Sequence, residues 1–335
     1  MKAARFLGNG RIEVIERDVP EVGEGQILVK VAYCGLCGSE KRLFRNGFDR
    51  CTPGHEMSGT VEVCGPNTTV LERGTGVVVY LSDYCGSCPA CQTRNTSQCY
   101  NRRGLIGWTF DGGYAEYVVV PEHMVYPIPG LSLDLGVLAL DTIGTAFHGL
   151  RQGEINSEHS VLVFGCGPIG LGCISILRNH YNVRAIYAAD TSEYRCAMAE
   201  QLGAKAIRID PSDTTGSLMA ALGNRRVDRV VEVVGLDDTV LASMRCVTPG
   251  GKIVFIGEPE KALHLVRTTD WILKDFSLIN SWYFPLSEMD DNLRFIKEHQ
   301  AEVRKLITHY FSIEGMTEAF EVFISGETGK VLIAM

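Results

Sequence analysis

The sequence predicts an α/β protein in which a β-barrel-like domain is joined to a doubly wound parallel sheet. Up to about residue 150, short β-rich runs are separated by glycine and proline. Beyond it, apolar strand-like runs alternate with helical stretches. The chain, at 335 residues, is also long enough for two domains. We therefore expect domains at residues 1–150 and 151–289, with residues 290–335 returning to the first.

The first domain is predicted to contain four short strands, each bounded by turn-forming residues. These strands are Ile27–Ala32, Gly59–Val63, Gly76–Leu81 and Tyr114–Val120. The returning segment is predicted to contain two helices and a final strand. These elements lie near Asp291–Glu298, near Met316–Ser325 and at Lys330–Ala334. Short strands between long loops are typical of a barrel-like or mixed β domain.

The second domain is predicted to repeat a β–α unit. A strand at Ser160–Phe164 precedes a helix to about Asn179, and a strand at Ala185–Ala189 precedes a helix at Glu193–Leu202. The alternation continues through Val227–Val234, Thr239–Cys246 and Lys252–Ile256. Because repeated β–α–β units place successive strands parallel, we expect a doubly wound parallel sheet.

Composition and charge exclude several classes of partner. The net charge is −8 and no run of basic residues stands out, so nucleic acid and anionic membranes are poor partners. No uncharged apolar run is long enough to cross a membrane, and we expect no signal peptide because the first residues lack an apolar core. Twelve cysteines without a secretion signal indicate metal binding in a reducing compartment, which we expect to be the cytoplasm.

Four cysteines in one short stretch predict a structural metal site. Cys85, Cys88, Cys91 and Cys99 have the spacing C-x2-C-x2-C-x7-C. Four thiolates complete a tetrahedral zinc shell and leave no position for a substrate, so such a site is structural. The alternatives are unpaired or disulfide-bonded cysteines and an iron–sulfur cluster, which thiolates at such spacings also hold.

A glycine-rich turn follows the first strand of the second domain. Gly165, Gly167 and Gly170 form a G-x-G-x-x-G pattern before an apolar helix. The first glycine permits a tight turn, the second lets the backbone approach a pyrophosphate, and the third lets the helix pack on the strand. Free N–H groups at the helix N-terminus, where Pro168 and Ile169 lie, suit the phosphate charge. The turn therefore predicts dinucleotide binding.

Asp190 indicates which dinucleotide is bound. It ends the next strand, twenty residues after Gly170. A carboxylate there accepts hydrogen bonds from the ribose hydroxyls and repels a 2′-phosphate, which favours NAD over NADP. Arg195 lies just beyond and keeps NADP as the alternative, because an arginine pairs well with the additional phosphate.

Two further segments resemble a known family. Cys34–Glu40, with the sequence CGLCGSE, resembles the C-G-x-C-G-[ST]-D segment of the zinc-dependent medium-chain dehydrogenase/reductase family. Gly54–Val61 is similar to its G-H-E-x-x-G-x-V element. The cysteine lobe, the glycine turn and the stretch from Lys305 to Val331 also lie where the family has them. The resemblance implies a GroES-like β-barrel catalytic domain and a Rossmann cofactor domain.

The resemblance implies a catalytic zinc site as well. Its ligands would be Cys37, His55 and Asp141, with Asp141 at the place of the family's third ligand. An aspartate that only caps the following helix would look the same. Glu56 either ligates the metal directly or acts from outside its shell. Three protein ligands leave one position open for substrate or water, and the two sites together imply two zinc ions per chain. Fe2+ or Co2+ could substitute at the open site.

The resemblance also assigns residues to proton transfer and to the cofactor. Ser39 matches the residue whose hydroxyl takes the alcohol proton, and Thr145 matches one that packs beside the nicotinamide. Arg42 stands where many relatives have a relay histidine, and Glu40 where the family has aspartate. We therefore expect the proton to leave Ser39 through the cofactor ribose and water.

Other residues are weaker candidates. Trp108 and Phe110 follow the cysteine lobe, and we expect them to line the substrate pocket or, alternatively, to pack in the core. Four histidines outside the motifs are expected to be structural or surface groups: His148, His180, His264 and His309.

The implied activity is hydride transfer between NAD and a secondary alcohol, polyol, sugar or cyclitol. The alternatives are a primary-alcohol dehydrogenase, a zinc-free quinone reductase, and a zinc-stabilised dinucleotide-binding protein without turnover.

Relatives join across sheet edges, and Lys252–Gly257 and Ser277–Phe284 are apolar segments suited to that role. We therefore expect a small-molecule alcohol as partner and a homotetramer or homodimer.

Overall fold

The chain folds into two units. The computed structural model describes residues 1–259, 261–262 and 269–335, so His264 lies outside the described residues. The first unit comprises Met1–Leu140, Phe284–Ser325 and Lys330–Met335, and the second comprises Asp141–Tyr283 and Gly326–Gly329.

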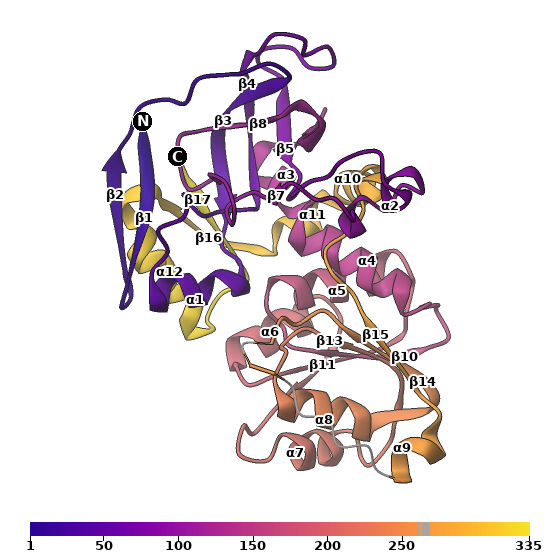
Figure 1. The fold of residues 1–335 in the computed structure, drawn as a ribbon. Helices are drawn as coiled ribbons and strands as arrows, with labels where there is room; N and C mark the ends of the chain where they lie inside the picture. The colour runs from indigo at the N-terminus through magenta and orange to yellow at the C-terminus, as the bar shows by residue number, and fades with distance from the viewer. Residues whose placement is uncertain (260, 263–268) are drawn as a thin grey trace. The chain divides into compact units, whose positions relative to one another are not determined.

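A seven-stranded sheet forms the centre of the first unit (Figure 1). Its order is β16-β17-β3-β4-β5-β9, and β8 also pairs with β3. These strands are β3 (Gln26–Gly35), β4 (Met57–Cys64), β5 (Gly76–Val79), β8 (Tyr117–Pro121), β9 (Val125–Pro127), β16 (Ile307–Ser312) and β17 (Lys330–Ala334). The C-terminal strand β17 lies inside the sheet, between β16 and β3, and its residues Val331, Leu332 and Ile333 are fully buried.

Smaller elements surround this sheet. Two small antiparallel sheets pair β1 (Lys2–Gly8) with β2 (Arg11–Glu16) and β6 (Ser82–Asp83) with β7 (Gly104–Leu105). The helices are α1 (Lys41–Asn46), α2 (Pro89–Gln92), α3 (Leu133–Leu138), α10 (Met289–Glu298), α11 (Gln300–Arg304) and α12 (Met316–Ser325). Single 3₁₀ turns lie at Gly38–Glu40, Thr96–Gln98, Glu122–Met124, Leu286–Glu288 and Ile313–Gly315.

The second unit is a six-stranded, all-parallel sheet with the order β12-β11-β10-β13-β14-β15. Its strands are β10 (Ser160–Phe164), β11 (Ala185–Asp190), β12 (Lys205–Arg208), β13 (Val227–Glu232), β14 (Val247–Phe255) and β15 (Ser277–Asn280). Between them run α5 (Pro168–Asn179), α6 (Glu193–Gln201), α7 (Thr214–Ala221), α8 (Asp237–Cys246) and α9 (Thr269–Lys274). A π-helical turn (Asp141–Thr145) leads into α4 (Ala146–Gln152).

The helices of this unit lie on both faces of the sheet, with α4, α5 and α6 on one side and α7, α8 and α9 on the other (Figure 1). The strand order reverses at β10, which lies between β11 and β13. Ligands bind beyond the carboxyl ends of strands at such a switch point. The predicted fold class, a β-barrel-like unit and a doubly wound parallel sheet, is confirmed. Within the described residues, no helix combines the length and apolarity needed to cross a membrane.

Candidate metal and dinucleotide sites

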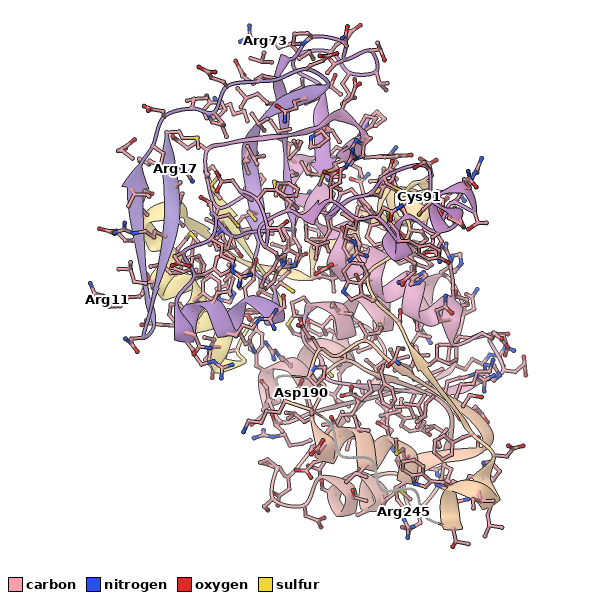
Figure 2. The ribbon with its side chains drawn as sticks, viewed as in Figure 1. Arg11, Arg17, Arg73, Cys91, Asp190 and Arg245 are labelled. Atoms are coloured by element: carbon pink, nitrogen blue, oxygen red, sulfur yellow. The ribbon has the colours of Figure 1, made fainter. Side chains whose placement is uncertain are left out.

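The four cysteines of the predicted structural site converge in the loop around α2, and Cys91 is labelled in Figure 2. Their sulfur atoms all lie within 4.8 Å of one another. The sulfurs of Cys88 and Cys99 are 3.9 Å apart, far beyond a disulfide bond. Zinc–sulfur bonds of about 2.3 Å in a tetrahedron place the sulfurs about 3.8 Å apart. The lobe therefore fits a zinc ion.

Backbone groups of the lobe favour thiolates. The N–H groups of Cys85 and Cys88 donate to the sulfurs of Cys99 and Cys85, each at 3.3 Å, and that of Tyr100 donates to Cys88 at 3.4 Å. Hydrogen bonds from the backbone of Ser87 and Cys88 lower the pKa of the Cys85 thiol to about 5. A divalent cation among the sulfurs would stabilise all four as thiolates.

A second group of metal-ligating side chains comprises Cys37, His55, Glu56 and Asp141, whose ligand atoms all lie within 4.8 Å of one another. Cys37 precedes the 3₁₀ turn at Gly38–Glu40, and His55 and Glu56 immediately precede β4. Asp141 opens the π-helical turn and follows Leu140, the last residue of this segment of the first unit. One thiolate, one imidazole and carboxylates are the donors that zinc takes in catalytic sites.

A buried carboxylate orients His55. Glu40, which is fully buried, places Oε1 2.9 Å from Nδ1 of His55. Oε2 of Glu40 accepts hydrogen bonds from the Tyr114 hydroxyl at 2.5 Å and from the N–H of Cys37 at 3.2 Å. Burial, followed by the charge of Glu40, raises the pKa of Tyr114, so it remains a donor. Because Nδ1 is engaged by Glu40, Nε2 is the nitrogen through which His55 would ligate a metal.

A buried lysine pairs with Glu56. Nζ of Lys330, at the start of β17, forms an ion pair with Oε1 of Glu56, and both side chains are 1% exposed. The same Nζ donates to the carbonyl of Leu36 at 3.0 Å. This ion pair connects Glu56 to β17, the last strand in the sequence.

Two hydroxyl groups contact members of the second metal group. Oγ of Ser39 donates to Sγ of Cys37 at 3.3 Å. Oγ1 of Thr145 donates to Oδ1 of Asp141 at 3.2 Å, across the π-helical turn. π-Helical turns are rare in proteins, and those that occur are often found at functional sites. The turn places Asp141 and Thr145 side by side.

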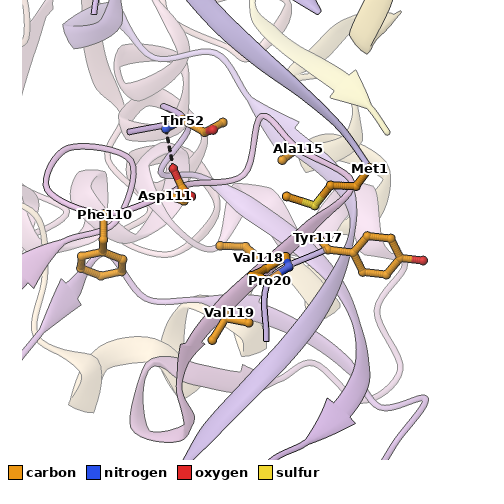
Figure 3. A pocket seen from close by; sticks show the side chains of 9 residues that line it. All are labelled: Met1, Pro20, Thr52, Phe110, Asp111, Ala115, Tyr117, Val118 and Val119. Atoms are coloured by element: carbon orange, nitrogen blue, oxygen red, sulfur yellow. Dashed lines mark hydrogen bonds between the residues drawn. The ribbon is translucent and has the colours of Figure 1, made fainter. Parts of the chain in front are cut away.

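Trp108 and Phe110 occupy different surroundings. The centre of the Trp108 ring lies 5.7 Å from that of His55, so Trp108 flanks the second metal group. Phe110 instead lines a pocket of about 200 Å³, shown in Figure 3. That pocket is lined by Met1, Pro20, Thr52, Phe110, Asp111, Ala115, Tyr117, Val118 and Val119. None of the four side chains of the second metal group lines it.

The glycine turn has the geometry that its three positions predict. Gly165 has φ +97°, in the left-handed region. A Cβ at Gly170 would lie 1.8 Å from the carbonyl oxygen of Gly165, whereas one at Gly167 would meet nothing within 4 Å. The turn is therefore closed against the strand and open at its middle glycine, as a pyrophosphate cradle requires. Pro168 and Ile169 open α5, whose N-terminus faces the turn.

Asp190 ends β11 beside this turn (Figure 2). Its Oδ2 accepts a hydrogen bond from the N–H of Cys166 at 2.7 Å, and its Oδ1 accepts one from Ser192 at 2.8 Å. A carboxylate has about four lone-pair sites, so capacity for ribose hydroxyls remains. The Nε of Arg195 donates to the carbonyl of Thr328 at 3.1 Å.

Comparisons with known proteins identify the family. The family model for the alcohol dehydrogenase GroES-like domain matches residues 23–130, and that for zinc-binding dehydrogenases matches residues 168–298. A medium-chain reductase/dehydrogenase from Acremonium is 34% identical over 289 residues, covering 80% of this chain and 97% of that protein. The chain belongs to the medium-chain dehydrogenase/reductase family. Membership makes it an oxidoreductase of the alcohol dehydrogenase type, and the recognition from sequence is confirmed.

Solved structures of this family share the whole fold. Galactitol-1-phosphate dehydrogenase from Escherichia coli has a TM-score of 0.88 at 26% identity, and the alignment covers 100% of both chains. A zinc-binding dehydrogenase from Sinorhizobium meliloti, bound to NADP, has a TM-score of 0.85 at 28% identity, covering 100% of this chain and 99% of that one.

Sequence reasoning did not identify Tyr114 and Lys330 as parts of the site. Tyr114 lies 74 residues from Glu40, and Lys330 lies 274 residues from Glu56. One signal for Lys330 was available, because it is a single lysine at the head of an otherwise apolar strand, KVLIA. Tyr114 carried no such signal. The roles of the predicted site residues stay predictions.

Proposed function

We propose that this protein is a zinc-dependent dehydrogenase that transfers a hydride between NAD and a secondary alcohol, a polyol, a sugar or a cyclitol. One observation carries the proposal: the ligand atoms of Cys37, His55, Glu56 and Asp141 lie within 4.8 Å of one another. In this proposal residues 1–150 and 290–335 form the catalytic domain, and residues 151–289 form the cofactor domain.

In this proposal some residues bind the metal and others orient the residues that bind it. Bound zinc supplies a Lewis acid that lowers the pKa of a substrate hydroxyl, and NAD supplies the hydride acceptor. Cys37, His55 and Asp141 hold the metal, and Glu40 fixes the imidazole of His55 through Nδ1. Lys330 engages the carboxylate of Glu56, which supports a role for Glu56 outside the ligand shell.

Ser39 accepts the substrate proton in this proposal. Its hydroxyl is within hydrogen-bond distance of the Cys37 sulfur, so it lies at the edge of the ligand set. A hydroxyl there accepts a proton only by passing its own onward. We assign that next step to the cofactor ribose and water, because Arg42 occupies the position where many relatives have a histidine.

NAD is the preferred cofactor in this proposal. Asp190 presents a carboxylate at the end of β11 and at the same time supports the glycine turn through Cys166. Arg195, the residue that would favour NADP, already donates to Thr328. Both features support NAD, although one solved relative was crystallised with NADP.

The test measures the reduction of NAD+ through the absorbance of NADH. The substrates offered are secondary alcohols, polyols, inositols, aminosugars and primary alcohols. We expect turnover with secondary alcohols or polyols and none in Cys37→Ala or His55→Ala, which should stay folded. Metal analysis should give two zinc ions per chain in the parent and one in Cys37→Ala. A zinc-replete protein that reduces neither cofactor with any substrate would favour the dinucleotide-binding alternative. Full activity in Cys37→Ala would remove the assignment of the metal ligands.

A further inference from the structure

Arg42, on α1, is connected to a proposed catalytic metal ligand through Trp108. Its guanidinium carbon is 5.0 Å from the centre of the Trp108 ring. The same indole lies 5.7 Å from the imidazole of His55. Trp108 therefore contacts both an exposed cation and a proposed zinc ligand.

The contact with Trp108 restrains the guanidinium of Arg42. A guanidinium over an indole face is attracted by the ring quadrupole, and the Trp108 ring is itself packed edge-on by Phe48 at 6.3 Å. The guanidinium carries its N–H groups in one plane, as a fork. That fork matches the two oxygens of a carboxylate or a phosphate.

The charge of the surrounding segment has the opposite sign to that of the whole chain. Residues 41–50, KRLFRNGFDR, contain four basic residues and one acidic residue, a net charge of +3, whereas the chain carries −8. A local positive field in an acidic protein attracts anions to that place. Of the four cations, Arg42 is the one with a described contact to Trp108.

We propose that Arg42 binds an anionic group of the substrate, a phosphate or a carboxylate, while the reacting hydroxyl lies at the metal ligands. The preferred substrate is then an alcohol or polyol that carries an anionic group several bonds from the hydroxyl. This inference rests on the proposed dehydrogenase function. Cofactor phosphates offer the same chemistry, so the experiment must separate the two sources of anion.

The experiment compares a neutral polyol, its monophosphate and a hydroxy acid in the parent enzyme, Arg42→Gln and Arg45→Gln. Arg45 is the matched control because its replacement removes the same charge from the same helix. We expect Arg42→Gln to lower the ratio of kcat/KM for the preferred anionic substrate to that for the neutral polyol by about 10- to 100-fold, the range for a hydrogen bond to a charged group. Arg45→Gln should leave this ratio within about twofold, since exposed charges contribute little.

Two outcomes would overturn the proposal. The first is an unchanged ratio in Arg42→Gln. The second is a rise in the KM for NAD+ that is equal with all substrates, which would show that Arg42 serves the cofactor phosphates.

A binding measurement keeps the proposal separate from the dehydrogenase function. Inorganic phosphate, added without cofactor, should change the fluorescence of the parent saturably, and the change should vanish in Trp108→Phe and in Arg42→Gln. A parent that turns over no alcohol yet shows this signal would refute the proposed function and keep the anion site. A parent without the signal would refute the anion site.

Discussion

Tyr114 supports a proposed metal ligand that it does not contact directly. Its hydroxyl donates to Glu40, and Glu40 in turn holds Nδ1 of His55. The Glu40 carboxylate is fully buried, so its oxygens need the hydrogen-bond donors around them. Glu40 is one carbon longer than the aspartate usual in the family, and the Tyr114 hydroxyl is one of the groups that fix this longer side chain.

Tyr114→Phe should weaken zinc binding at the catalytic site by about tenfold, the lower range for loss of an outer-shell partner. Chelator competition on the zinc-loaded protein measures this affinity. Tyr80→Phe is a matched control, because Tyr80 is equally buried and donates to the carbonyl of Phe284. Both variants should lose about 1 kcal/mol of unfolding free energy. Equal zinc affinities in the two variants would contradict a positioning role for Tyr114.

Asp190 has two roles that one substitution removes together. Asp190→Ala should raise the KM for NAD+ by about tenfold or more, since hydrogen bonds to a charged group contribute about 1.5–3 kcal/mol. It should also narrow the preference for NAD+ over NADP+, because the repulsion of a 2′-phosphate is removed. Steady-state kinetics with both cofactors measure the two effects. A parent enzyme that already prefers NADP+ would refute this reading, and Arg195 would then become the residue to vary.

At the scale of elements, the four-cysteine lobe stands out because it has almost no core of its own. Its buried cluster consists of Cys88, Ala90 and Cys99, with Tyr84 and the two remaining cysteines packed against it. No aliphatic side chain larger than alanine belongs to this described cluster. With so little apolar burial, we expect the lobe to draw its stability from a bound metal ion.

Cys88→Ser should therefore lower the zinc content from two ions to one per chain and make residues 85–99 susceptible to proteolysis. The melting temperature should fall as well, since metal binding to the folded state is part of the folding free energy. Cys64→Ser is the control for loss of a thiol, because Cys64 is exposed and lies outside both metal groups. An unchanged zinc count in Cys88→Ser would contradict the structural site.

The elements that sequence could predict are those whose signals are local. The glycine turn lies between an apolar strand and an apolar helix, and all of its positions are within six residues. The π-helical turn at Asp141–Thr145 was not predicted, because it has no periodicity that distinguishes it from the start of an α-helix. The pairs Glu40–Tyr114 and Glu56–Lys330 were not predicted either, because their residues are far apart in the sequence and come together only when the chain folds.

At the scale of the whole molecule, the exposed end of the parallel sheet bears on assembly. Among the residues that the structure describes, β15 is the edge strand and pairs with β14 alone. No charged residue occurs from Phe276 to Ser287, and the exposed fraction is 40% for both Leu278 and Trp282. An unprotected apolar edge of this kind invites pairing with a second chain.

We therefore expect a homo-oligomer joined through β15, with a tetramer slightly favoured over a dimer. Light scattering at micromolar concentration should give a mass of at least twice the 36.8 kDa of one chain. Leu278→Lys should lower the measured mass toward that of one chain, because a charge on the edge strand opposes its pairing with the edge strand of a second, two-fold-related copy. Leu241→Lys is the control, since Leu241 is 42% exposed but lies on α8. A parent mass of one chain, or equal effects of the two variants, would contradict assembly through this edge.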